Sequence, residues 1–284
     1  MIKISIIMVT LNSIKFLADA LESIRQQTYA NIEYIVIDGG STDGTIDVLR
    51  KTRLVSHFVS EKDKGIYDAL NKGIKMATGD VIGILHSNDM FATTHTLQNI
   101  RDVFASSTLT TGEHKRIDVV YGDLVYVEAE DTNNIIRNWE SQSFQPKLIN
   151  RGWMPPHPSV FIRKEVYQKH GFYDLSYKIA ADYDYLIRVF KDNNLTTYYL
   201  PKVITKMRKG GISNNGIKNL ICKSKEDYKI IKYHKMSFPL WVLLLKNISK
   251  LPQLILRHQN NTQSDIPTNR SQTYSNIPSF NIAQ

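Results

Sequence analysis

One stretch decides the fold: Ile32-Glu33-Tyr34-Ile35-Val36-Ile37-Asp38-Gly39-Gly40-Ser41-Thr42-Asp43-Gly44. Residues 32–37 are mostly apolar and predict a buried strand, which stops at an aspartate followed by two glycines. Two further apolar segments end in polar residues: residues 4–9 before Thr10-Leu11-Asn12, and residues 80–85 before His86-Ser87-Asn88-Asp89. Strands with such ends are typical of the carboxyl edge of an open α/β sheet, where ligands bind.

The segments between these strands have the apolar spacing of helices. We expect helices over 14–27, 45–51 and 66–76, a short strand over 56–60 and a longer strand over 119–127. This alternation favours a parallel sheet with right-handed crossovers, and therefore the α/β class. Residues 128–158 are polar and irregular and predict a lid or acceptor loop. A strand over 159–163, a helix over 164–170, a helix carrying Asp182 and a strand over 197–200 follow.

The composition is that of a globular protein. The chain has 284 residues, of which 42% are hydrophobic and 22% are charged, enough for one large domain or one and a half. Its one cysteine, Cys222, excludes an intrachain disulfide framework and fits a reducing compartment. The sequence shows neither a signal-peptide pattern at Met1 nor an apolar run of about 18 residues. We therefore expect a cytoplasmic protein.

The positive charge is concentrated near the C-terminus. Residues 202–258 contain 13 Lys+Arg and 2 Asp+Glu, a net +11, so the rest of the +9 chain carries 9 − 11 = −2. The candidate partners of this region are anionic lipid and nucleic acid, and a solvated helix face is the third explanation. We do not expect nucleic acid, because no recognised nucleic-acid-binding pattern accompanies the charge.

The basic region contains an apolar run with a tryptophan, Phe238-Pro239-Leu240-Trp241-Val242-Leu243-Leu244-Leu245, followed by Lys246, Lys250 and Arg257. This combination predicts either a helix in a membrane interface or an amphipathic helix packed on the rest of the protein. Residues 259–284 are rich in Asn, Gln, Ser, Thr and Pro and are predicted to be disordered.

Three strand-end side chains are candidates for ligand binding. Asp38 has glycines beside it that allow close approach, and it could accept hydrogen bonds from a base or a ribose; the alternative is a turn-forming Asp. No GxGxxG fingerprint follows the first strand, which counts against a dinucleotide fold. Asp89, next to Asn88, could be the single carboxylate of a Mg²⁺ or Mn²⁺ site, or simply a strand-end turn.

Asp182 and Asp184 begin a helix two positions apart, so they face different directions. One could enter the site while Asp184 pairs with Arg188, and either could simply be stabilised by the helix dipole. The functional interpretation of Asp182 is favoured only if the fold brings this residue opposite Asp89. The stripe Tyr67, Leu70 and Ile74 predicts helical core.

Five motifs in order resemble the inverting nucleotide-sugar glycosyltransferases of family 2. They are Ser5-Ile6-Ile7-Met8-Val9-Thr10-Leu11-Asn12, then 36–45, 60–73 and 85–89, and finally Gly171-Phe172-Tyr173-Asp174 with Ala181-Asp182-Tyr183-Asp184 and Arg188. The loop Gly210-Gly211-Ile212-Ser213 is also similar to one in these enzymes. The resemblance covers residues 1–215 and implies a GT-A fold, with a Rossmann-like, mostly parallel sheet flanked by helices. We divide the chain into 1–215 (catalytic domain), 216–258 (basic helical extension) and 259–284 (tail).

The resemblance also implies roles. Thr10, Asn12, Asp38 and Asp63 would line the nucleotide pocket, and Asn88 would lie near the ribose or diphosphate. Asp89 would hold Mg²⁺ or Mn²⁺, and Asp182 would be the catalytic general base. His157, between two prolines, would bind substrate near the acceptor or diphosphate; the alternative is a structural histidine.

The implied substrates are a nucleoside-diphosphate sugar as donor and a glycan or lipid-linked acceptor. Relatives of the polysaccharide-building type imply cell-surface glycan synthesis, as in lipopolysaccharide or capsule, at the inner face of the cytoplasmic membrane.

Two positions depart from the family pattern. Many relatives have two adjacent acids where this chain has Asn88-Asp89, and Glu-Asp where it has Ala181-Asp182. These changes motivate the alternative of a non-catalytic sugar-nucleotide-binding protein on the same fold. A third hypothesis is a nucleotidyltransferase, which would normally show a Gly-rich loop with Arg or Lys after the first strand; residues 10–15 do not show one.

Overall fold

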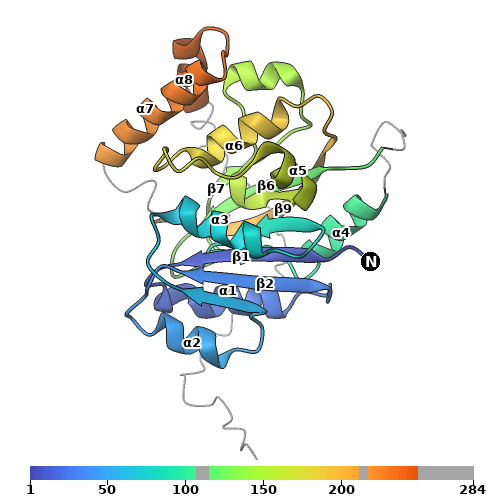
Figure 1. The fold of residues 1–284 in the computed structure, drawn as a ribbon, viewed down its shortest axis with the longest axis vertical. Helices are drawn as coiled ribbons and strands as arrows, with labels where there is room; N and C mark the ends of the chain where they lie inside the picture. The colour runs from blue at the N-terminus through green and yellow to red at the C-terminus, as the bar shows by residue number, and fades with distance from the viewer. Residues whose placement is uncertain (107–114, 211–216, 249–284) are drawn as a thin grey trace, which may run out of the picture.

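The fold is a nine-stranded sheet with helices on both faces (Figure 1). It was obtained as a computed structural model that describes residues 1–106, 115–210 and 217–248. The strand order is β3-β2-β1-β4-β8-β6-β9-β5, and β7 pairs with β6. The strands are β1 Ile4–Thr10, β2 Ile32–Asp38, β3 His57–Ser60, β4 Val81–Ile84, β5 Met90–Phe91, β6 Val119–Val127, β7 Ile135–Trp139, β8 Val160–Arg163 and β9 Thr197–Arg208.

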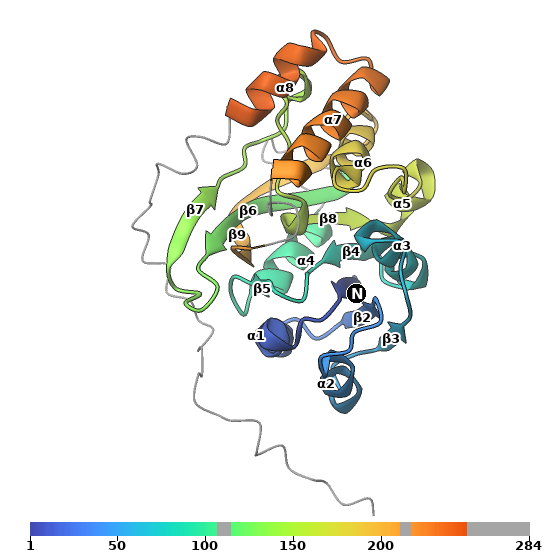
Figure 2. The same ribbon diagram turned by 90° about the vertical axis from the view of Figure 1, so that its left-hand side faces the viewer.

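The parallel order predicted for the first strands is confirmed, since β3, β2, β1 and β4 are all parallel neighbours. Beyond β4 the sheet is mixed. β8 runs antiparallel to both β4 and β6, whereas β9 runs parallel to β6. In Figure 2, β6, β7 and β9 run together beyond the parallel strands. The carboxyl ends of β1 and β2 lie side by side, because Thr10 is in register with Asp38.

Two hydrophobic layers cover the sheet. The helices are α1 Ile14–Arg25, α2 Thr45–Lys51, α3 Ile66–Met76, α4 Thr96–Ser106, α5 Lys164–His170, α6 Ala181–Phe190, α7 Ile217–Tyr233 and α8 Pro239–Ile248, with 3₁₀ turns at Pro146–Arg151 and His157–Ser159. One core cluster joins α3, α5 and α6 to the sheet, and the other joins α1, α2 and α4 to it. Alternate residues of a strand point to opposite faces, so Ile7 belongs to the first cluster and Ile6 to the second.

The structure contains elements that the sequence did not predict, among them the short strand β5. Helix α4 occupies a stretch for which no helix was predicted, and its Leu97, Ile100 and Phe104 are buried at helical spacing. Strand β7 lies in the segment predicted to be irregular; all of its residues are half-buried, so it lacks an alternating pattern. Strand β9 continues past residue 200 through Pro201, near the place where its register with β6 shifts.

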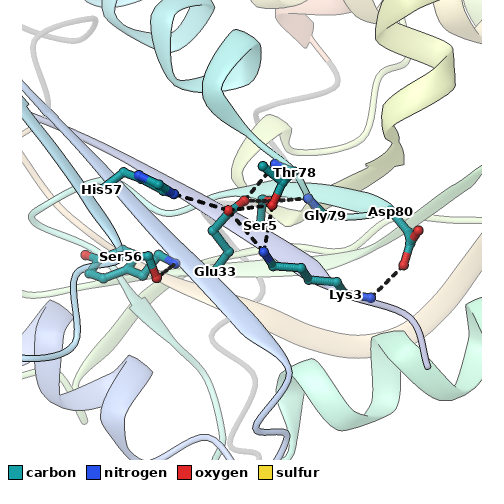
Figure 3. Close-up of polar contacts among 9 residues, drawn as sticks. Lys3, Ser5, Glu33, Ser56, His57, Thr78, Gly79 and Asp80 are labelled. Atoms are coloured by element: carbon teal, nitrogen blue, oxygen red, sulfur yellow. Dashed lines mark hydrogen bonds and ion pairs between the residues drawn. The ribbon is translucent and has the colours of Figure 1, made fainter.

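A carboxylate ties the parallel strands together at their amino ends, away from the polar strand ends (Figure 3). Glu33 is 2% exposed and accepts hydrogen bonds from Ser5 Oγ at 2.6 Å, Thr78 Oγ1 at 2.6 Å and Lys3 Nζ at 3.1 Å. Burial alone would raise the pKa of Glu33, but these donors and the Thr78 amide outweigh it and lower the pKa to about 2. Glu33 therefore links β1, β2 and the turn before β4.

The C-terminal helices α7 and α8 pack next to α6 (Figure 1). Ile230, Ile231, Met236 and Val242 are buried in the same cluster as α6, as the packed-helix interpretation of the apolar run requires. In the part of the chain that the structure describes, no helix has the length and hydropathy of a membrane span. Residues 211–213 of the predicted glycine loop and the predicted tail lie outside the described residues.

Candidate active site

Two loops at the carboxyl ends of β1 and β2 bring Thr10, Asn12 and Asp38 together. The Gly39 amide donates to the carbonyl oxygen of Thr10 at 2.9 Å. Asn12 adopts a positive φ of 49°, which Asn tolerates better than most residues, and its Oδ1 accepts a hydrogen bond from the Thr42 amide at 2.8 Å. Thr10 Oγ1 is buried and has no hydrogen-bond partner among the described residues. This hydroxyl is therefore available to a ligand or to a water molecule.

Asp38 is fully buried and organises its own loop. Its Oδ2 accepts hydrogen bonds from the amides of Gly40 and Ser41, each at 3.0 Å, and from Ser60 Oγ at 2.6 Å. Its Oδ1 accepts a hydrogen bond from Ser41 Oγ. This arrangement favours the turn interpretation that the sequence left open. Asp38 shapes the loop, and much of its acceptor capacity is already used.

Asp63 reaches the same edge from the loop that follows β3. Its Oδ1 accepts a hydrogen bond from Lys72 Nζ at 2.5 Å. A Cβ atom added at Gly39 would lie 3.3 Å from Asp63 Oδ2, so a larger residue at position 39 would crowd this carboxylate. Four of the predicted nucleotide-binding residues, Thr10, Asn12, Asp38 and Asp63, therefore lie on adjoining loops.

Asp89 is the predicted metal ligand, and it is 3% exposed. Its Oδ1 accepts a hydrogen bond from the Arg208 amide at 3.3 Å, whereas its buried Oδ2 has no hydrogen-bond partner in the described ranges. Burial raises the pKa of Asp89 to about 7, against the opposing effect of Arg208. A hydrogen bond of 2.8 Å between Ser87 Oγ and Ser13 Oγ joins this loop to the loop of Asn12.

Arg208, at the end of β9, is a site residue that the sequence analysis missed. Its Nη1 donates to the carbonyl oxygen of Asn88 at 3.0 Å, its Nε donates to the carbonyl oxygen of Ala129 at 2.9 Å, and it forms an ion pair with Asp19. It is nearly buried, although the sequence placed it only within the basic C-terminal region. A single arginine in a strand carries no motif, so no sequence signal marked it. Asn88 itself is exposed.

The residues present fit a divalent cation that takes most of its ligands from a substrate. Among the described residues, no group of three or more His, Cys, Asp or Glu side chains converges as a complete metal cage. The free Oδ2 of Asp89 offers one hard oxygen ligand. Mg²⁺ is often held by one or two carboxylates together with phosphate oxygens, and this donor set suits that arrangement.

Asp182 lies in the first turn of α6 and is held by two donors. Its Oδ1 accepts hydrogen bonds from Tyr67 OH at 3.1 Å and from the Tyr183 amide at 2.8 Å. Burial raises the pKa of Asp182, but His157, Lys223 and Lys246 outweigh burial, and the pKa is lowered. The ring of Tyr67 is core, as predicted, but its hydroxyl was missed. A Tyr in place of an aliphatic residue in that stripe was the available signal.

Two histidines lie near Asp182. His157 Nε2 is 2.7 Å from Tyr173 OH, and burial lowers the pKa of His157 while Asp182 opposes the change. Burial and the neighbouring His157 lower the pKa of His86 to about 4. The structure thus places His157 beside the predicted base, and it adds His86, which the sequence analysis had not singled out.

The negative charges of Asp89 and Asp182 both influence the pKa of one phenol, that of Tyr126. Burial is the main reason why the pKa of Tyr126, on β6, is raised; Arg137 opposes the change, and the charges of Asp89 and Asp182 add to it. Asp89 and Asp182 therefore both lie within electrostatic range of Tyr126. Asp184 points elsewhere: it pairs with Arg188 Nε at 3.0 Å, which confirms that predicted pair, and with His234 Nε2 at 2.7 Å.

Comparison with known proteins gives a family and a fold. Residues 5–170 match the family described as Glycosyl transferase family 2. The chain is 31% identical over 261 residues to a PGL/p-HBAD biosynthesis glycosyltransferase of Mycobacterium bovis, an alignment that covers 89% of this chain and 92% of the relative.

Solved structures with low sequence identity share the fold. TarS of S. aureus aligns with a TM-score of 0.62 at 18% identity, and the match covers 87% of this chain but 44% of TarS. A shorter TarS chain, in complex with UDP-GlcNAc, aligns with a TM-score of 0.59 at 16% identity, covering 82% and 65%. Mannosyltransferase PcManGT from Pyrobaculum calidifontis, in complex with GDP-Man and Mn²⁺, aligns with a TM-score of 0.59 at 17% identity, covering 89% and 73%.

Proposed function

Because the chain belongs to glycosyl transferase family 2, we propose that it transfers a sugar from a nucleoside-diphosphate sugar to an acceptor hydroxyl, with inversion. The acceptor is a glycan or a lipid-linked glycan, and the product is a cell-surface glycan such as lipopolysaccharide or capsule. The enzyme works in the cytoplasm, peripherally on the inner face of the membrane. The mycobacterial relative named for PGL/p-HBAD biosynthesis supports a role in glycan synthesis.

The donor would bind at the loops of β1, β2 and β3. The unpartnered hydroxyl of Thr10, the exposed Asn12 and the carboxylate of Asp63 face this edge, with Asp38 shaping the loop between them. Asn88 would lie near the ribose or the diphosphate. Proteins of the same fold have been solved with UDP-GlcNAc and with GDP-Man, which supports a nucleotide-sugar donor.

Asp89 would hold Mg²⁺ or Mn²⁺ through its free Oδ2. When bound, such an ion offsets the negative charge that develops on the departing diphosphate. The Mn²⁺ in the PcManGT complex supports a divalent ion in this fold. Arg208, fixed against Asp89 and Asn88, keeps the loop in position.

Asp182 would act as the general base. It takes the proton from the acceptor hydroxyl, whose oxygen forms a bond to the anomeric carbon. The bond from that carbon to the diphosphate oxygen breaks, and the nucleoside diphosphate leaves with the electron pair. Tyr67 OH and the Tyr183 amide both bind Oδ1, so among the described residues Oδ2 makes no hydrogen bond and is available to the hydroxyl. His157 would contact the acceptor or the diphosphate.

One observation carries the proposal: Asp89 keeps a buried Oδ2 without a hydrogen-bond partner among the described residues, while Asp182, whose Oδ1 is held by Tyr67 and Tyr183, lies within electrostatic range of the same phenol, Tyr126. A base and a diphosphate-binding carboxylate must lie around one substrate. The proposed roles require the two carboxylates to lie near each other, and the sequence motifs by themselves do not imply this.

The test is release of nucleoside diphosphate from a panel of nucleotide sugars, together with transfer to acceptor glycans. Asp182→Asn should reduce transfer by several orders of magnitude and leave nucleotide binding nearly intact. Asp102→Asn is the matched control, because this exposed carboxylate on α4 lies outside the motifs of the resemblance. Nucleotide binding without transfer in the wild-type protein would favour the non-catalytic binding protein.

A further inference from the structure

The hairpin of α7 and α8 presents an outer face that the rest of the described protein does not cover. Four apolar side chains on it are strongly exposed: Phe238 (79%), Leu240 (71%), Trp241 (57%) and Leu244 (47%). Val242, on the opposite side of α8, is fully buried. We call the four exposed residues the outer apolar face. An exposed apolar cluster of this kind marks an interaction surface.

The charges of the hairpin are divided between its two sides. Four lysines are exposed: Lys225, Lys229, Lys232 and Lys235. The acids of residues 217–248, Glu226 and Asp227, are directed inward. Asp227 is buried and pairs with Lys246 Nζ at 2.7 Å. In the described hairpin, the strongly exposed charged side chains are therefore positive.

Glu226 connects the hairpin to the segment that carries Asp182. Its Oε1 accepts a hydrogen bond from the Lys178 amide at 2.8 Å, and its Oε2 accepts hydrogen bonds from the amides of Ile179 at 2.9 Å and Ala180 at 3.0 Å. These amides lead directly into α6. One carboxylate on the hairpin therefore fixes the backbone two to four residues before the proposed base.

Helix α8 makes a second connection to the same segment. Lys246 Nζ lies 3.1 Å from the ring centroid of Tyr183, the residue that follows Asp182. Helix α8 also packs tightly on Gly152, where an added Cβ atom would lie 2.7 Å from Lys246 Cβ. Helix α8 is thus held against the start of α6 and against the turn before Trp153.

We propose that the outer apolar face and the exposed lysines bind an anionic lipid bilayer, and that this contact orders the segment 178–183 that carries Asp182. The apolar side chains would enter the headgroup boundary while the lysines face the anionic lipid. The charge complementarity favours lipid over a protein partner. The role of Asp182 and the membrane location rest on the proposed function, but the contacts that join the hairpin to residues 178–183 do not.

The coupling follows from the hydrogen bonds of Glu226. A hairpin fixed at a surface fluctuates less, and the amides that donate to Glu226 then open less often. Slower opening at 178–183 would keep the base in its working position. Transfer would consequently be favoured where a lipid-linked acceptor is found.

The test uses the full chain with vesicles of phosphatidylcholine, with and without phosphatidylglycerol. Flotation measures binding, and amide hydrogen exchange measures opening at Lys178, Ile179 and Ala180. We expect binding to the anionic vesicles and several-fold slower exchange at these amides. Absence of binding overturns the proposal, as does binding with unchanged exchange. Self-association without vesicle binding would assign the face to a second copy and would also overturn it.

Two variants test separately the binding surface and the coupling of that surface to residues 178–180. Trp241→Ser combined with Leu244→Ser should weaken vesicle binding at least tenfold, with Asn247→Ser as the exposed control on the same helix. Glu226→Gln should still bind vesicles but lose the slowing of exchange at 178–180. If the double variant fails to fold by circular dichroism, Lys225→Gln with Lys229→Gln tests the same surface through its charge. None of these measurements needs a nucleotide sugar, so failure of the transfer reaction would appear separately.

Discussion

The phenol oxygen of Tyr67 lies 3.1 Å from Asp182 Oδ1, although the two residues are 115 positions apart in the chain. The same hydroxyl lies 2.6 Å from the carbonyl oxygen of Ile179. Tyr67 comes from the first turn of α3, and Asp182 from the first turn of α6. The single proton of this hydroxyl is shared between the two acceptors, the nearer being the Ile179 carbonyl, so one side chain of α3 contacts both the proposed base and the backbone leading to it.

Removal of this hydroxyl should slow transfer without unfolding the protein. Tyr67→Phe keeps the ring in the core and loses a hydrogen bond to a carboxylate, a contribution of about 1.5 kcal/mol or more. We expect kcat to fall about tenfold, with little change in the KM for the donor. Steady-state kinetics would measure both, with Tyr228→Phe on α7 as the control. A variant that loses only thermal stability would assign Tyr67 a structural role.

Divalent metal should strengthen nucleotide binding through Asp89. A thermal-shift panel of nucleoside diphosphates, with and without Mn²⁺, should show one nucleotide class that stabilises the protein. Ligand at about 100 times its Kd adds about 2.7 kcal/mol. Asp89→Asn should remove the metal-dependent part of that shift, whereas Asp102→Asn, an exposed carboxylate on α4, should not. Equal shifts in Asp89→Asn and wild type would contradict the metal role.

Glu33 should make the free energy of unfolding depend on pH. Its pKa lies at about 2 in the folded protein, below its ordinary value of 4.5. The contribution of Glu33 to the free energy of unfolding is therefore fully present above pH 4.5 and is lost as the pH falls through 2. At about 1.4 kcal/mol per pKa unit, the gap corresponds to about 3 kcal/mol.

Glu33→Gln should lower the free energy of unfolding at pH 7 by up to about 3 kcal/mol, and the difference from wild type should shrink between pH 4.5 and 2. Urea unfolding at several pH values measures this. Glu165→Gln, which removes an exposed ion pair with Arg116, should change stability by less than about 1 kcal/mol. A pH-independent difference for Glu33→Gln would show that its ionisation is not the cause.

Gly73 lets α3 approach the sheet. A Cβ atom at this position would lie 2.5 Å from Ile7 Cγ2, inside contact distance. At an uncrowded helix position, Gly→Ala usually raises the free energy of unfolding. Here we expect overpacking to lower it by about 1–3 kcal/mol. Chemical denaturation of wild type, Gly73→Ala, Ile7→Ala and the double variant gives a double-mutant cycle of unfolding free energies. We expect the double variant to lose less stability than the sum of the two single variants; strict additivity would mean that the contact is not the cause.

The sequence predicted the parallel half of the sheet because its signals are local. Apolar segments that stop at Asp, Asn and Gly defined β1, β2 and β4 and placed Thr10, Asp38 and Asp89 at one edge. The pairing of Asp184 with Arg188 was also predictable, since residues four apart meet on a helix. Helix α4 and strand β7 were missed, and β7 carried no periodic signal because it is half-buried throughout.

The sequence by itself determined the family, the order of the elements in the parallel half of the sheet and which carboxylates stand at strand ends. Only the tertiary structure decided what those carboxylates contact. In the structure, Asp38 accepts hydrogen bonds from its own loop, and Asp89 Oδ2 has no hydrogen-bond partner among the described residues. The Arg208 amide donates to Asp89, and Glu226 accepts hydrogen bonds from the amides before α6. These contacts join residues far apart in the chain. They depend on where helices cross the sheet, which local composition and spacing do not encode.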